Sequence, residues 1–163
     1  MKTLILMRHG KSSWGDPTLD DHDRCLNERG IASAKALGDW LRDKGYLPDM
    51  ALVSTALRTR ETFDELSLPC GPQYHGTLYL AEPDVMLASL RKAVGDTVLM
   101  IGHNPGIGWL AQDLVTHPPA HPRFDDYPTG ATLVVRFAVK DWAEVRPGGG
   151  EVLDFIVPRD LMP

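Results

Sequence analysis

Residues Met1–Gly10 read MKTLILMRHG, and this stretch decides how the rest of the chain is interpreted. Leu4 to Met7 form an apolar run that is too short for a helix and apolar on both faces, so it predicts a buried strand. The run ends at a cation, an imidazole and a glycine, in Arg8, His9 and Gly10. A buried strand that delivers these groups to its carboxyl end indicates an anion site beside a nucleophile or base. On this tripeptide alone, residues that simply face solvent are at least as good an interpretation.

Composition sets the limits of the interpretation. A length of 163 residues predicts a single domain over residues 1–163, and 43% apolar with 24% charged residues is typical of a globular chain. The net charge of −5 argues against nucleic acid as a partner. No stretch approaches the roughly 20 apolar residues of a membrane span. Cys25 and Cys70 are too few for a disulfide scaffold, so we expect a cytoplasmic protein, with a monomer as the default state.

Short apolar runs alternate with stretches of helical periodicity along the chain. The predicted strands are residues 4–7, 50–53, 78–80 and 97–101. The first predicted helix spans residues 28–44, between Asn27 and Gly45. The second is capped by Ser54 or Thr55 and ended by Pro69, and the third runs from Pro83 to Gly95. The fourth has Asn104 as its N-cap and Pro105 at its first position. Residues 117–130 are rich in proline and predict an irregular surface segment, whereas 133–139 and 153–157 alternate like antiparallel strands. This order predicts a three-layer α/β/α fold, with a mostly parallel central sheet and an antiparallel C-terminal β edge.

Polar residues follow three of the predicted strands. Ligands of such sheets bind beyond the carboxyl ends of the strands, so we expect Arg8, His9, Arg58 and His103 to meet at one edge. Arginine binds phosphate oxygens bidentately, and the helix that starts near Asn104 adds backbone N–H groups. Neutral imidazole is a capable nucleophile toward phosphorus. The sequence therefore predicts a site for a phosphoryl group.

Several other chemistries have little support. The acidic run Asp20–Asp23 lacks the ligand spacing of a calcium loop and predicts a solvated loop. His117 and His121 are separated by prolines, which remove the helical face that would aim both rings at one metal. No nucleotide-binding loop or cluster of metal ligands accompanies the histidines, and neither cysteine lies in a phosphate-cradling loop. We therefore expect neither a metal nor a cofactor.

The combined motifs resemble the histidine phosphatase superfamily, also called phosphoglycerate mutase-like. The motifs that carry this resemblance are Arg8-His9-Gly10 with Ser12 and Trp14, the stretch from Ser54 to Thr62, and Gly102-His103-Asn104-Pro105. Within this superfamily, the chain resembles most the small SixA-like phosphohistidine phosphatase branch. This finer resemblance rests on Lys11–Trp14, Asp23–Gly30 and Pro128–Ala131, and on the lack of a large helical insertion. Cys25 departs from this branch, which usually has proline there.

The resemblance implies a role for each matching residue. His9 would be the nucleophile that becomes phosphorylated, while Arg8, Arg58 and His103 would bind the phosphoryl oxygens. Ser12 and the backbone near Asn104 would add hydrogen bonds to the substrate. The implied substrate is phosphohistidine in a protein, which would be hydrolysed without a metal to release phosphate.

Two alternatives stay open, a small-molecule phosphomonoesterase on the same site and a non-catalytic domain that binds phosphate or a partner. The open, uninserted build favours a protein substrate over a small one. All four core residues are present, which disfavours the non-catalytic alternative.

The general acid is the weakest part of the prediction. Larger relatives carry a glutamate after the third strand, and Glu82 stands near that place but is displaced by about two residues, within the error of boundaries set from sequence. Glu82 fits better as the cap of the helix at Pro83, which leaves Asp16 and Asp20 as other candidates. A P–N bond needs less help from an acid than a phosphomonoester does, so a missing acid is consistent with phosphohistidine.

Overall fold

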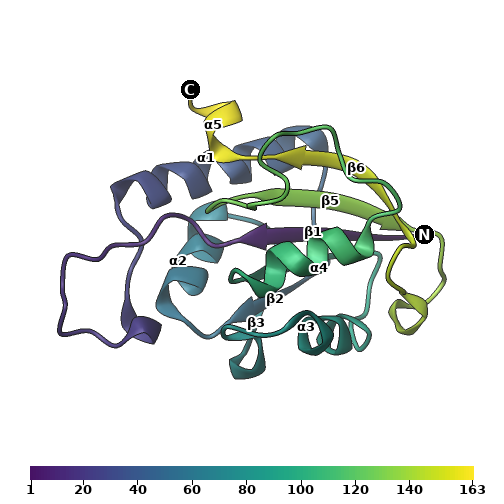
Figure 1. The fold of residues 1–163 in the computed structure, drawn as a ribbon, viewed down its shortest axis with the longest axis horizontal. Helices are drawn as coiled ribbons and strands as arrows, with labels where there is room; N and C mark the ends of the chain where they lie inside the picture. Colours follow the sequence, from purple (N-terminus) through teal and green to yellow (C-terminus); the bar gives the residue numbers. More distant parts are fainter.

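A computed structural model describes residues 1–163 and contains one six-stranded sheet covered by helices on both faces (Figure 1). The strands are β1 (Lys2–Arg8), β2 (Met50–Ser54), β3 (Pro72–His75), β4 (Thr97–Gly102), β5 (Thr132–Phe137) and β6 (Gly150–Ile156), and their order in the sheet is β3-β2-β4-β1-β5-β6. The four strands β1 to β4 are parallel, and β5 pairs antiparallel with both β1 and β6. The predicted fold class is therefore confirmed.

The central strand β1 is buried on both faces. Leu4 and Leu6 pack in one apolar cluster with helices α3 (Pro83–Leu90) and α4 (Gly106–Leu114). Ile5 and Met7 pack in a second cluster with α1 (Glu28–Lys44) and α2 (Leu57–Leu66), on the opposite face. Successive side chains of a strand point to opposite faces, so a strand covered by helices on both sides must be apolar throughout.

Helix α1 has the predicted bounds. The Asn27 side chain accepts a hydrogen bond from the Gly30 N–H at 2.8 Å, which satisfies one of the free donors of the first turn. At the other end, Gly45 has φ 75°, a left-handed conformation that costs a glycine little.

The third strand was predicted wrongly. Residues 76–78 form the short 3-10 helix η2 (Gly76–Leu78), and the strand is the preceding segment Pro72–His75. This strand lies at the edge of the sheet and pairs only with β2. Its residues are mostly exposed, so they lack the apolar pattern from which a buried strand is predicted.

Three helix ends also differ from the prediction. Helix α2 begins after Ala56, and neither Ser54 nor Thr55 caps it. Helix α4 begins at Gly106, with Pro105 rather than Asn104 at the N-cap position. Helix α3 ends at Leu90, before the predicted Gly95.

The proline-rich segment 117–130 is irregular, as predicted, but it is anchored in the core. Phe124 and Tyr127 are fully buried, and the Tyr127 hydroxyl donates to the Leu6 carbonyl at 2.5 Å. The chain is completed by the 3-10 helices η1 (Asp21–Asp23) and η3 (Trp142–Glu144) and by the short helix α5 (Pro158–Leu161). None of the helices combines the length and apolar character needed to cross a membrane.

Candidate active site

Three neighbouring parallel strands bring the predicted residues to one edge of the sheet. Strands β2, β4 and β1 are adjacent, and Arg8 at the end of β1 pairs in register with Gly102 at the end of β4. The rings of His9 and His103 lie 5.3 Å apart between centroids. Arg58, in the first turn of α2, places Nε 3.4 Å from His9 Nε2 and Nη2 3.3 Å from His103 Nδ1. We call Arg8, His9, Arg58 and His103 the core site.

His9 is held in a defined tautomer. Its Nδ1 lies 2.6 Å from the Gly10 carbonyl oxygen, which only accepts, so Nδ1 carries the proton and the lone pair is on Nε2. The Gly10 N–H donates to the Thr62 hydroxyl at 3.0 Å, and that hydroxyl donates to the Arg58 carbonyl at 2.7 Å. Helix α2 therefore positions both the histidine and the arginine beside it.

Both histidines are neutral. Burial, followed by the nearby charges of Arg8 and Arg58, lowers the pKa of His9 to about 3, against the opposing effect of the Gly10 carbonyl. Burial also lowers the pKa of His103 to about 3, together with His9 and Arg58. Because Arg58 donates to His103 Nδ1, the proton of His103 is on Nε2, which donates to the Ser54 hydroxyl at 2.8 Å.

Arg8 has an unused hydrogen-bonding group. Its Nη1 donates to the Tyr127 carbonyl at 3.3 Å, but its buried Nε has no partner. Burial and the positive charge of Arg58 lower the pKa of Arg8. These two guanidinium groups, that of Arg58 buried and that of Arg8 partly buried, favour a bound anion, which would satisfy the free donor and offset their repulsion.

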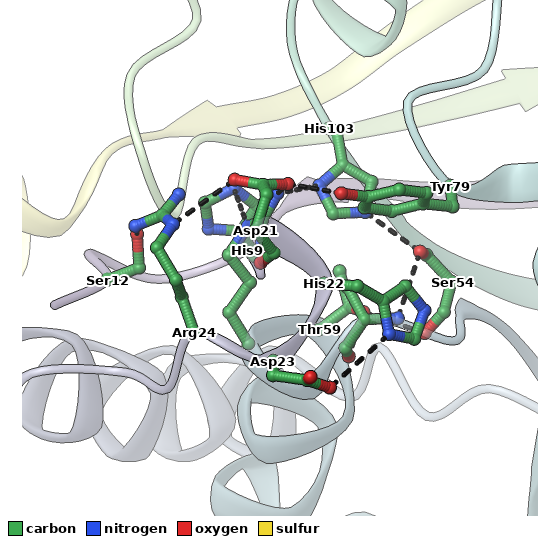
Figure 2. Close-up of polar contacts among 12 residues, drawn as sticks. His9, Ser12, Asp21, His22, Asp23, Arg24, Ser54, Thr59, Tyr79 and His103 are labelled. Carbon is green, nitrogen blue, oxygen red and sulfur yellow. Dashed lines mark hydrogen bonds and ion pairs between the residues drawn. The ribbon is translucent and has the colours of Figure 1, made fainter. Parts of the chain in front are cut away.

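An aspartate from the loop after β1 already touches this site. The Asp21 carboxylate accepts from Arg58 Nη2 at 2.9 Å and Arg24 Nε at 3.1 Å, and from the Tyr79 hydroxyl. The Asp21 carbonyl also accepts from Arg58 Nη1 at 2.6 Å. Figure 2 shows the Asp21 carboxylate between Arg24 and Tyr79, beside His9 and His103. Asp20, Asp21 and Asp23 are exposed, as predicted for a solvated acidic segment, but residues 21–23 form a 3-10 helix and Asp21 also bonds to the site.

The Asp21 carboxylate is a stable anion in this position. Burial raises the pKa of this carboxyl, but hydrogen bonds from Tyr79 and Arg58 lower it by more, so its pKa is well below its usual range. Its interactions use donors that a phosphoryl group would also need. The geometry is that of an anion-binding site closed by a side chain of the same protein.

Comparison with known proteins agrees with this geometry. A family model described as the histidine phosphatase superfamily (branch 1) matches residues 4–88, just over half of the chain. The chain belongs to the histidine phosphatase superfamily. An uncharacterized protein of Mycobacterium tuberculosis (strain H37Rv) is 37% identical over 161 residues, which cover 94% of this chain and 100% of that protein.

Solved structures extend the similarity over nearly the whole chain. A candidate phosphohistidine phosphatase SixA from Nakamurella multipartitia is 31% identical with a TM-score of 0.83, over 96% of both chains. A candidate phosphohistidine phosphatase SixA from Agrobacterium tumefaciens is 25% identical with a TM-score of 0.78, over 96% of this chain and 98% of that one. These similarities support phosphatase activity of the histidine type.

Within this histidine phosphatase fold, the two predicted substrate-binding residues have protein partners. The Ser12 hydroxyl accepts from Arg24 Nη1 at 2.6 Å, at the edge of the core site. The Asn104 amide donates to the Asp126 and Tyr127 carbonyls, both at 3.0 Å, and its oxygen accepts from the Gly108 N–H at 3.2 Å. Asn104 therefore fastens segment 117–130 to α4.

The structure does not bring any of the three acid candidates into contact with the core site. Glu82 occupies the N-cap position of α3 without a side-chain hydrogen bond. Asp16 is exposed and accepts from Thr18, and Asp20 is exposed and its side chain forms no hydrogen bond. Asp21 and Tyr79, which were not predicted, are the titratable groups at the site, and the proton between them is on the Tyr79 hydroxyl, which donates to the Asp21 carboxylate. The spacing of Asp21 and Arg24, three residues apart in a dense run of charge, was the available sequence signal.

The arrangement has no cluster of metal ligands. No three His, Cys, Asp or Glu side chains come close enough to hold an ion together. Of the two histidines weighed as ligands in segment 117–130, His121 pairs with Asp160 at 2.9 Å. The guanidinium groups of Arg8 and Arg58 in the core site bind anions rather than cations.

Proposed function

We propose that this protein is a metal-independent phosphohistidine phosphatase that acts through a phospho-His9 intermediate. The observation that carries the proposal is the tautomer of His9, with Nδ1–H bonded to the Gly10 carbonyl and the Nε2 lone pair facing Arg58 Nε at 3.4 Å. A neutral imidazole with its lone pair on Nε2 is the nucleophilic form. The cations beside it attract the phosphoryl group that it would attack.

The proposed reaction has two steps at His9. The Nε2 lone pair attacks phosphorus, the new N–P bond forms, and the P–N bond to the substrate imidazole breaks with its electron pair going to that ring. Arg8 and Arg58 stabilise charge on the transferring oxygens, and His103, predicted to bind these oxygens itself, supports Arg58 by accepting a hydrogen bond from its Nη2 at 3.3 Å. Water then attacks phosphorus, the N–P bond breaks, and phosphate leaves with His9 restored.

Phosphohistidine in a protein is the substrate that the comparisons favour, since the similar Nakamurella protein is a candidate enzyme of that type. An imidazole is a far weaker base than an alkoxide, so it leaves with less help from a proton donor. None of the predicted acids contacts the core site, which fits such a leaving group.

A small-molecule phosphomonoesterase is the second candidate. Its support comes from Tyr79, which places a hydroxyl at the site, where an alkoxide leaving group would need a proton donor. Comparing turnover of phosphohistidine peptides with that of phosphomonoesters separates the two candidates.

The proposal places a single domain, residues 1–163, in the cytoplasm as a monomer. Its two free cysteines, Cys25 and Cys70, suit a reducing compartment. The acidic net charge of −5 disfavours nucleic acid as a partner.

Trapping the intermediate tests the proposal. The protein is incubated with a radiolabelled phosphohistidine protein in the presence of a chelator, and label is sought on His9 as an acid-labile phosphoramidate. His9→Ala should remove the label and reduce kcat/KM by at least about a thousandfold, because loss of a nucleophile disables the whole covalent route. His75→Ala, at a histidine outside the core site, is the matched control. Activity that survives His9→Ala nearly intact rejects the mechanism.

A further inference from the structure

A basic cavity lies beside the core site, on the side of the sheet that α1 and α5 cover. It has a volume of about 250 Å³, and none of the nine residues that line it is acidic. Its polar lining residues are Lys11, Arg29, Ser33, Arg123, Thr129 and Arg159. Four cations therefore converge in one concave place on a protein whose net charge is −5. Clefts lined by one sign of charge focus the field and attract ligands of the opposite sign.

Two of these cations have no partner within the protein. Arg123 forms an ion pair with Asp126 at 2.9 Å, and Arg29 donates to the Met162 carbonyl at 3.1 Å. Lys11 and Arg159 form neither an ion pair nor a side-chain hydrogen bond, and both are exposed. The cavity keeps a net positive charge after its internal pairs are counted.

The walls of the cavity are fixed by close backbone contacts. A Cβ added at Gly30 would lie 2.1 Å from the Lys11 carbonyl oxygen, so the backbone of α1 is in direct contact with the segment that follows β1. A Cβ added at Gly130 would lie 2.5 Å from Pro158 Cγ, which fixes segment 117–130 against α5. Because these contacts hold the walls in place, a ligand would meet a largely preformed cavity.

The cavity and the core site are formed by the same two backbone segments. Lys11 is two residues from His9, so their Cα atoms are at most about 7 Å apart. Thr129 precedes Gly130, whose N–H donates to the His9 carbonyl at 2.9 Å. A ligand that places a phosphoryl group on His9 thus has the basic cavity within reach of its neighbouring groups.

We propose that the basic cavity is a docking site for acidic side chains that lie near the phosphohistidine on the substrate protein. Arginine and lysine bind carboxylates by charge-assisted hydrogen bonds, and the half-open cavity admits side chains from a protein surface. The inference rests on the proposed function and adds a specificity determinant to it. The enzyme selects phosphohistidines with acidic neighbours.

Two phosphohistidine peptides of equal length test this selectivity. One carries glutamates three to six residues from the phosphohistidine, and the other carries glutamines there. Dissociation constants are measured by fluorescence anisotropy in the His9→Ala background, so that neither peptide is consumed. We expect the acidic peptide to bind about tenfold more tightly, because exposed ion pairs contribute up to about fivefold each.

Charge reversal locates the effect. Arg159→Glu and Arg29→Glu should each reduce the preference for the acidic peptide to about twofold or less. Lys140→Glu is the matched control, since Lys140 is exposed and follows β5, at the end of the sheet opposite the core site. The control should keep the tenfold preference.

The outcomes separate this inference from the function on which it rests. Equal binding of the two peptides, or a preference that persists in both charge-reversal variants, overturns the docking site. Failure of the unsubstituted protein to hydrolyse either peptide, or to label His9, rejects the proposed function, while the two dissociation constants still decide the docking site.

Discussion

At the scale of single residues, Asp21 occupies hydrogen-bond donors at the core site before substrate binds. Its carboxylate occupies Arg58 Nη2 at 2.9 Å and Arg24 Nε at 3.1 Å, so an incoming phosphoryl group competes with a resident anion. Arg58 Nη1 is held by the Asp21 carbonyl at 2.6 Å, a contact that a change of side chain leaves in place. The carboxylate charge can therefore be tested without removing the loop.

Asp21→Asn should strengthen the binding of inorganic phosphate by about threefold or more. The amide keeps the shape of the side chain but removes the negative charge that competes for Arg58, and partly exposed ion pairs are worth up to about 1 kcal/mol. The inhibition constant of phosphate, measured against a phosphoramidate substrate, gives the result.

Asp23→Asn is the control for this prediction, because it makes the same change of charge in the same 3-10 helix, at a residue paired only with His22 at 3.9 Å. Weaker phosphate binding by Asp21→Asn than by Asp23→Asn would show that the carboxylate orients Arg58 for substrate rather than competing with it.

The core residues were predictable from sequence, whereas Asp21 and Tyr79 were not. Arg8, His9, Arg58 and His103 each follow a buried strand closely, and the edge of a parallel sheet brings such positions together. Asp21 reaches the site through an irregular loop of some ten residues, and Tyr79 follows a short 3-10 helix. The direction of such side chains depends on tertiary contacts rather than on local periodicity.

At the scale of elements, the predictions succeeded where the signals are local. Asn27 and Gly45 lie immediately beside the helix that they bound, so both ends of α1 follow from sequence. The edge strand β3 has one neighbouring strand and little buried surface. Its residues therefore need not be apolar, and they lack the pattern from which a buried strand is predicted. The start of α2 was misplaced because Ser54 bonds to His103 and serves the site instead of the helix.

The contact between α1 and α2 depends on a glycine. A Cβ added at Gly38 would lie 2.2 Å from the Leu66 carbonyl oxygen at the end of α2, closer than any real contact allows. Gly38→Ala should lower the free energy of unfolding by about 2 kcal/mol, since the steric cost outweighs the gain of about 1 kcal/mol in helix propensity. Urea denaturation measures the change.

Gly71→Ala is the companion variant, because no atom lies within 4 Å of a Cβ added at Gly71. Its unfolding free energy should stay within about 0.5 kcal/mol of the unsubstituted protein. A stabilised Gly38→Ala protein would mean that the helices separate at little cost and that α2 is not held rigidly against α1.

At the scale of the whole molecule, the buried site links stability to pH. His9 is 5% exposed and His103 2% exposed, and both have a pKa of about 3 in the folded protein, compared with an ordinary value of 6.5. Between these values the unfolded chain binds protons that the folded protein refuses, so stability falls as pH decreases. The stability associated with the two neutral histidines is fully present above pH 6.5 and is lost progressively as the pH falls toward 3.

The slope of this loss can be measured. Each histidine contributes up to about 1.4 kcal/mol per pH unit, so the two together give at most about 2.7 kcal/mol per unit between pH 6 and 4. Urea denaturation at pH 7, 6, 5 and 4 gives the slope for the unsubstituted protein. His9→Asn removes one of the two groups and should reduce the slope by about 1.4 kcal/mol per unit, whereas His75→Asn, at the half-buried end of β3, should leave it nearly unchanged. Equal slopes for the unsubstituted protein and His9→Asn would mean that His9 binds a proton in the folded state, which would remove the neutral nucleophile on which the proposed mechanism depends.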